Sequence, residues 1–142
     1  FLLHLEDIRF DSPREIAYAR KKEKNMYTFY EYPKCSTCRK AKAELNQLGL
    51  DVESINIKEN PPSAQFLKEL LEGSDLELKK FFNTSGQSYR SLGLKDKLPT
   101  LSLDEAVELL ASDGMLIKRP ILIKDGKVLQ VGYRTPYQDL NL

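Results

Sequence analysis

Two cysteines separated by two residues are the side chains of this chain with the clearest chemistry. Cys35 and Cys38 lie in the sequence Cys-Ser-Thr-Cys and are the only cysteines among 142 residues. This spacing, between a predicted strand and a predicted helix, is typical of a redox-active thiol pair. A structural zinc site needs four Cys or His ligands, and the single histidine is the distant His4. We therefore expect no metal site within the chain.

The start of the predicted helix gives the two thiols different roles. Unpaired backbone N–H groups of the first helical turn stabilise a thiolate and lower its pKa, and Cys35 is the better placed thiol. Residues 33–43 include four basic side chains and no acidic one, which favours the same ionisation. Cys38 follows one turn later, so we predict Cys35 as nucleophile and Cys38 as resolving thiol. A buried pair of inert cysteines is the alternative, and Lys40 and Lys42 are expected to be solvated.

A strand, a helix and a second strand must position this pair. The aromatic and β-branched run at 27–32 predicts a strand, and residues 39–48, rich in helix-forming side chains, predict a helix. Apolar residues in segment 52–57 predict a second strand, which ends before Asn60-Pro61-Pro62. Together these elements form a βαβ unit, for which a right-handed parallel crossover is expected.

The rest of the chain predicts helices followed by a hairpin. Segment 63–114 carries helical patterns, including a capping box of Ser102 with Glu105. Residues 121–131 contain two apolar strands around an Asp-Gly sequence that suits a type I′ turn, and Thr135-Pro136 opens a final short helix. The order of elements predicts an α/β domain with a small mixed β-sheet and a helical insertion at about 63–114.

Composition and charge narrow the class of protein. Hydrophobic residues make up 41% and charged residues 30%, as in ordinary globular chains. No apolar run reaches the roughly 18 to 20 residues that cross a bilayer, and the N-terminus lacks a signal-peptide pattern, so we expect a cytoplasmic protein away from membranes. With 22 basic and 21 acidic side chains, there is no strong positive field, and direct binding of nucleic acid is not expected.

Residues 1–25 differ from the rest and end in a charged run before Met26. We expect a peripheral extension. It is either foreign to a native protein that starts at Met26 or a genuine N-terminal helix. Residues 26–142 form the predicted domain.

Resemblance to a known family rests on four segments: YPKCSTCRKA, ENPPS, FFNTSGQSYRSLGL, and IKRPILI with a following VGY. In this order they resemble the arsenate reductase-like family, which includes the Spx and MgsR regulators. The resemblance runs from Tyr27 to about Tyr133 and implies a thioredoxin/glutaredoxin-like fold. It also implies that Cys35 is the nucleophile and that Arg119 precedes a cis proline, Pro120.

Two arginines are candidates for binding an anion. The resemblance matches this chain to arsenate reductases at Arg39 and Arg119, and it places Arg119 near Cys35. There Arg119 is expected to contact an oxyanion or a glutathione carboxylate, which the planar guanidinium suits. A plain surface arginine is the alternative for Arg119.

Departures from the family pattern bear on the substrate. Glutaredoxin-coupled arsenate reductases of this fold carry two further arginines, where this chain has Asn83 and near Val131 or Gly132. An oxyanion needs several convergent donors, and those enzymes commonly lack a cysteine at the position of Cys38. We therefore predict a thiol-disulfide oxidoreductase, with arsenate reduction left open. We expect no bound cofactor and an external reductant: glutathione, glutaredoxin or thioredoxin.

The alternative function is that of a redox-responsive regulator. The C-x-x-C is shared with Spx, whose internal disulfide modulates a protein that binds the C-terminal domain of the RNA polymerase α subunit. Gly73 falls near the glycine that the resemblance assigns to this contact, whereas the chain ends at Leu142 without the longer basic tail of those regulators. A small thiol or redox protein is the expected partner, the polymerase α subunit is the alternative, and a monomer is expected.

Overall fold

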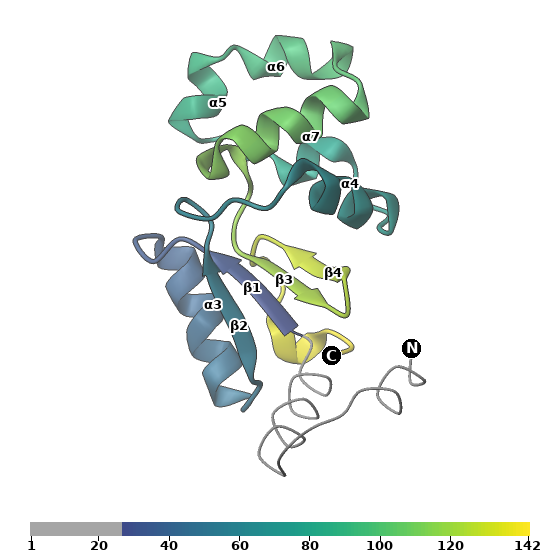
Figure 1. Cartoon of the computed structure of the whole chain (residues 1–142). Helices are drawn as coiled ribbons and strands as arrows, with labels where there is room; N and C mark the ends of the chain where they lie inside the picture. Colours follow the sequence, from purple (N-terminus) through teal and green to yellow (C-terminus); the bar gives the residue numbers. More distant parts are fainter. Residues whose placement is uncertain (1–26) are drawn as a thin grey trace, which may run out of the picture.

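A computed structural model describes residues 27–142, and the predicted order of elements is confirmed (Figure 1). The βαβ unit and the hairpin consist of β1 (Tyr27–Glu31), α3 (Ser36–Gln47), β2 (Val52–Asn56), β3 (Ile121–Lys124) and β4 (Lys127–Val131). The prediction for residues 1–25 lies outside the described residues. No helix between residues 27 and 142 combines the length and the apolar character that a bilayer span requires.

The four strands form one mixed sheet in the order β2-β1-β3-β4. β1 runs parallel to β2 and antiparallel to β3, and β3 pairs antiparallel with β4. The hairpin turn has positive φ at Asp125 (52°) and Gly126 (78°), as a type I′ turn requires. The α/β class and the small mixed sheet are therefore confirmed.

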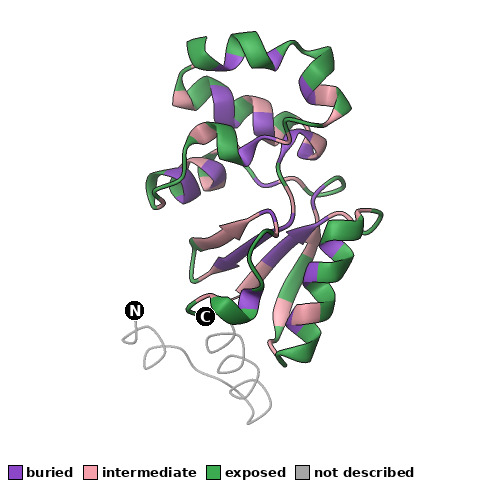
Figure 2. Cartoon of the chain, turned by 180° about the vertical axis from the view of Figure 1, so that it is seen from behind, coloured by how far each residue is buried: buried purple, intermediate pink, exposed green. Residues whose placement is uncertain are grey.

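Two hydrophobic clusters lie on opposite faces of the sheet. Successive side chains of a strand point to opposite faces, so Phe29 and Tyr30 of β1 enter different clusters. One cluster lies between the sheet and α3 and contains Phe29, Ala41, Leu45, Leu122 and Tyr137. The other extends from Tyr30 into the helical insertion, whose buried side chains Figure 2 shows in purple.

The helical insertion begins after β2 and ends before β3. Its elements are α4 (Ala64–Glu72), η1 (Leu78–Phe81), α5 (Gln87–Ser91), α6 (Leu94–Lys97), η2 (Leu98–Thr100), α7 (Leu103–Ser112) and η3 (Gly114–Leu116). The hydroxyl of Ser63 caps α4 by accepting from the backbone N–H of Phe66 at 3.1 Å. Ser102 and Glu105 form both hydrogen bonds of the predicted capping box at the start of α7.

A close backbone approach joins the insertion to the sheet. A Cβ atom added at Gly114 would overlap the carbonyl oxygen of Ile57, the residue after β2. The following segment is then fixed by the N–H of Lys118, which donates to the carbonyl of Phe81 at 2.8 Å. Because this segment leads directly into Arg119, the insertion sets the position of that side chain.

One predicted helix boundary is wrong. Helix α3 begins at Ser36 and not at Arg39, because Cys35 takes an extended conformation (φ −87°, ψ 123°) and is itself the N-cap residue. The final short helix is a single 3-10 turn, η4 (Tyr137–Asp139), which follows Pro136. The earlier start of α3 places Cys38 inside its first turn.

Candidate functional site

Cys35 lies at the junction between β1 and α3. Its backbone N–H donates to the carbonyl of Tyr32 at 2.9 Å, and its carbonyl accepts the N–H of Arg39 at 3.1 Å. The first bond closes the turn after β1, and the second begins the hydrogen-bond ladder of α3. Both cysteines are free thiols; the side chain of Cys35 is partly exposed and that of Cys38 is buried.

The pKa of the Cys35 thiol lies below its ordinary value. Partial burial raises this pKa, but the effect is outweighed by the backbone N–H and the thiol of Cys38, the charge of Arg119 and the backbone N–H of Thr37. Thr37 and Cys38 are the second and third residues of α3, whose N–H groups normally face the side chain of an N-cap residue. A sulfur at this position is therefore stabilised as a thiolate.

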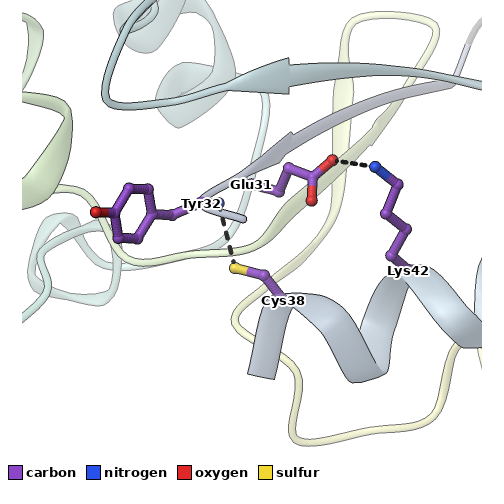
Figure 3. Close-up of polar contacts among 4 residues, drawn as sticks. All are labelled: Glu31, Tyr32, Cys38 and Lys42. Atoms are coloured by element: carbon purple, nitrogen blue, oxygen red, sulfur yellow. Dashed lines mark hydrogen bonds and ion pairs between the residues drawn. The ribbon is translucent and has the colours of Figure 1, made fainter. Parts of the chain in front are cut away.

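Cys38 has the opposite character. Its side chain is completely buried, and burial raises the pKa of its thiol to about 12, with the nearby Cys35 sulfur acting in the same direction. The backbone N–H of Tyr32 donates to Cys38 Sγ at 3.5 Å, which holds this thiol against the end of β1 (Figure 3). The reduced site thus contains one thiol whose pKa is lowered and one whose pKa is raised.

The positive charge of Arg119 acts on both cysteine sulfurs. Its peptide bond to Pro120 is cis, and its charge lowers the pKa of Cys35 and of Cys38. The guanidinium Cζ lies 5.3 Å from the centroid of the Tyr32 ring. Its Nε and Nη1 atoms are buried and have no hydrogen-bond partner among the described residues. Buried, unpaired guanidinium donors beside a reactive sulfur are suited to an anionic or polar group of a substrate.

The structure places Arg39 away from the buried part of the site. It is exposed on α3, and its Nη1 atom donates to the carbonyl of Pro33 at 3.3 Å. The basic flank of Cys35 therefore contributes less than the sequence suggested. The cation that lowers its pKa is Arg119, which is remote in sequence.

The two positions that lack arginine lie beside the segment that carries Arg119. The N–H of Gly132 donates to the carbonyl of Pro120 at 2.8 Å, and the N–H of Asn83 donates to that of Leu116 at 2.7 Å. Gly132 has a φ of 78°, and a Cβ atom there would lie 3.1 Å from the side chain of Lys118. The family resemblance implies cationic side chains at these two places, but here they are an amide and a hydrogen atom.

An ion pair between a buried glutamate and an exposed lysine was not predicted. Glu31 is only 4% exposed, and its Oε2 atom lies 2.7 Å from Nζ of Lys42, one turn beyond Cys38 (Figure 3). Period-two alternation from the buried Phe29 was the signal available in the sequence, because it places Glu31 on the face covered by α3. Lys42 is exposed, as predicted, and in addition pairs with Glu31.

A second missed cluster joins α3 to the C-terminal segment. Glu44 accepts hydrogen bonds from the hydroxyl of Tyr133 at 2.5 Å and from the backbone N–H groups of Tyr137 at 2.6 Å and Gln138 at 3.0 Å. No local pattern predicts these contacts, because the partners are far apart in sequence. Within residues 27–142, no group of three or more His, Cys, Asp or Glu side chains is placed to hold a metal ion.

Comparison with known proteins agrees with this architecture. The chain is 60% identical over 107 residues to "Uncharacterized protein YusI" of Bacillus subtilis (strain 168), over 75% of this chain and 90% of that protein. It is 32% identical over 108 residues to "Global transcriptional regulator Spx" of Lactiplantibacillus plantarum (strain ATCC BAA-793 / NCIMB 8826 / WCFS1), over 76% of this chain and 80% of the regulator.

A solved structure is also similar. The crystal structure described as that of "a possible arsenate reductase" from Streptococcus mutans UA159 superposes with a TM-score of 0.79 and 70% sequence identity, over 81% of this chain and 97% of that one. This match confirms the α/β, thioredoxin-like fold with a helical insertion. The sequence profile of the ArsC family matches residues 30–137, a region that contains both cysteines and Arg119. The chain therefore belongs to the ArsC family.

Proposed function

We propose that this protein is a thiol-disulfide oxidoreductase that uses Cys35 as nucleophile and Cys38 as resolving thiol. The observation that supports this most is the opposite displacement of two neighbouring thiol pKa values, lowered for Cys35 and raised to about 12 for Cys38. Because a thiolate and not a thiol attacks sulfur, this asymmetry assigns the first attack to Cys35. Its partial exposure also lets a substrate reach it.

The first step is attack of the Cys35 thiolate on a disulfide of the substrate. A bond forms between Cys35 Sγ and one substrate sulfur while the substrate S–S bond breaks. The second substrate sulfur leaves as a thiolate and takes a proton from water. Arg119 stabilises the thiolate of Cys35 before the attack and offers its free N–H donors to the bound substrate.

The second step releases the substrate. Cys38 loses its proton to water, and its thiolate attacks Cys35 Sγ, so that a Cys35–Cys38 disulfide forms and the remaining substrate sulfur leaves as a thiolate. Overall, two protein thiols are oxidised and one substrate disulfide is reduced to two thiols. Two equivalents of an external thiol, from glutathione, glutaredoxin or thioredoxin, then restore the dithiol. Such a cycle suits a reducing compartment such as the cytoplasm.

Arsenate is the weaker candidate substrate. Moving an oxyanion out of water requires several charged donors, and the positions of Asn83 and Gly132, which flank the Arg119 segment, carry no cation. A disulfide is neutral at its reacting atoms and does not meet this demand. The site therefore favours disulfide exchange over arsenate reduction.

Trapping of the mixed disulfide tests the assignment. The wild type, Cys38→Ser and Cys35→Ser are incubated with glutathione disulfide, and the intact masses are measured. Cys38→Ser is expected to accumulate one glutathione adduct, the wild type to form the internal disulfide, and Cys35→Ser to react slowly. Equal adduct formation by the two single variants would contradict the proposed roles.

A second candidate function is that of a redox-responsive regulator. It is supported by the 32% identity to a protein named a global transcriptional regulator. Gly73, the C-cap residue of α4, is exposed at the end of that helix, where the family resemblance assigns a polymerase contact. Binding of the isolated C-terminal domain of the RNA polymerase α subunit to the reduced and the oxidised protein decides this candidate. Absence of binding in both states eliminates it.

A further inference from the structure

Tyr137 carries a hydroxyl group that nothing in the described structure uses. The side chain is fully buried, yet its hydroxyl has no hydrogen-bond partner among the described residues. Its backbone is held firmly, because its N–H donates to Glu44. Burying an unpaired hydroxyl is unfavourable, so a position fixed in this way calls for an explanation.

The ring of Tyr137 packs on the face of α3 that carries Cys38. The buried residues of α3 are Cys38, Ala41 and Leu45, which share one face of the helix, and the last two belong to the same hydrophobic cluster as Tyr137. Burial raises the pKa of the Tyr137 hydroxyl, and negative charge on Cys38 acts in the same direction, which agrees with this arrangement. The unpaired hydroxyl and the buried thiol therefore share one interior region between α3 and the sheet.

We propose that Tyr137 is a positioning residue for Cys38, whose thiolate accepts a hydrogen bond from the Tyr137 hydroxyl, directly or through one water, while Cys38 attacks the mixed disulfide. The inference rests on the proposed exchange reaction. In the reduced protein the two groups are not hydrogen-bonded, and a neutral thiol, as a weak acceptor, attracts the hydroxyl only weakly. A buried thiolate is a strong acceptor that needs a donor.

The charged and polar groups around Cys38 and Tyr137 agree with a role of Tyr137 in stabilising the Cys38 thiolate. The Cys35 sulfur raises the pKa of Cys38, whereas Arg119 and the backbone N–H of Tyr32 lower it. Negative charge on Tyr133, Cys38 or Glu44 raises the pKa of the Tyr137 hydroxyl. Once Cys35 is part of a mixed disulfide, its negative charge is gone, and Arg119, the Tyr32 N–H and the Tyr137 hydroxyl remain to stabilise the Cys38 thiolate.

Tyr137→Phe tests the proposal, with Tyr133→Phe as its matched control. Each variant removes one hydroxyl and keeps the ring, but the hydroxyl of Tyr133 binds Glu44. The reduced wild type and both variants are mixed with glutathione disulfide, and the release of glutathione from the transient Cys35 adduct is followed by acid quenching and mass measurement at several pH values. Tyr137→Phe is expected to slow this release by about tenfold or more and to move its pH profile to higher pH, whereas Tyr133→Phe leaves both unchanged. Equal release by the two variants would overturn the proposal.

A second measurement separates this proposal from the proposed function. In Cys35→Ser, which cannot carry out the exchange, the pH midpoint of Cys38 alkylation reports its ionisation, because the access of the reagent to this buried thiol changes the rate at every pH and not the midpoint. Adding Tyr137→Phe is expected to raise this midpoint by about one pH unit. A lower urea midpoint with an unchanged pH midpoint would assign Tyr137 a structural role only. With Tyr137 retained, its ring Cζ chemical shift is expected to follow Cys38 ionisation in NMR spectra, and an invariant shift would also overturn the proposal.

Discussion

The backbone N–H of Tyr32 donates a hydrogen bond to Cys38 Sγ at 3.5 Å, so the residue that follows the central strand β1 directly holds the buried thiol of α3. The preceding residue, Glu31, reaches Lys42 one helical turn further along. The last residue of β1 and the residue after it thus fix α3 at two points, one through an ion pair and one through a thiol. This double attachment sets the distance between the sheet and the reactive end of the helix.

Lys42→Met is expected to lower the free energy of unfolding by about 1–3 kcal/mol, because it leaves the buried carboxylate of Glu31 without its partner. Urea unfolding measures this loss. Adding Glu31→Gln removes the buried charge and is expected to restore part of the stability. An unchanged midpoint in Lys42→Met would show that Glu31 does not depend on this pair.

Arg119→Met is expected to raise the pKa of Cys35 and to slow its alkylation at pH 7 several-fold, because the thiolate loses its nearby cation. The same variant is not expected to lower the free energy of unfolding, since the guanidinium donors it removes have no partner in the described structure. Arg119→Lys is the control that keeps the charge. Alkylation of Arg119→Met at the wild-type rate would show that Arg119 does not activate Cys35.

Arsenate reduction is expected to be at least about a hundredfold less efficient than reduction of glutathione disulfide, since two of the converging donors are missing. Steady-state kcat/KM for the two substrates measures this difference. Asn83→Arg is expected to lower the KM for arsenate, whereas Asn83→Gln leaves it unchanged. Comparable efficiency of the wild type with both substrates would contradict the claim that the site favours disulfide exchange over arsenate reduction.

Gly114→Ala is expected to destabilise the protein by at least about 3 kcal/mol, because the new methyl group would overlap the carbonyl of Ile57. Glu108→Ala, an exposed substitution in the neighbouring helix α7, is expected to change stability by less than about 0.5 kcal/mol. Thermal or urea unfolding compares the two. A small effect at Gly114 would show that the insertion moves freely against the sheet.

Much of the fold was predictable because its signals are local. Ser63, the Ser102–Glu105 capping box and the Asp125-Gly126 turn each report on a few neighbouring residues, and all three predictions are confirmed. The start of α3 was placed three residues too late, because the cysteine at its N-cap is not among the residue types that usually mark a helix start.

The candidate site was predictable only in part. The two thiols follow from spacing, whereas Arg119 enters the prediction through family resemblance, because the cis peptide bond and its place beside the sulfurs are set by distant segments. Nothing local marks the contact between Glu44 and Tyr137. The burial of Glu31 was difficult to predict because it lies in an aromatic strand. Only its two-residue spacing from Phe29 indicates that it points to the buried face.

The central claim is tested most directly by the pH dependence of alkylation at each cysteine of the reduced wild type, resolved by peptide mass spectrometry. Because its pKa is lowered, Cys35 ionises at a lower pH than an ordinary thiol. Because its pKa is raised, Cys38 ionises at a higher pH. The account predicts a midpoint for Cys35 below about 8.5 and one for Cys38 well above it. A Cys35 midpoint at or above about 8.5, or equal midpoints for the two thiols, would contradict it.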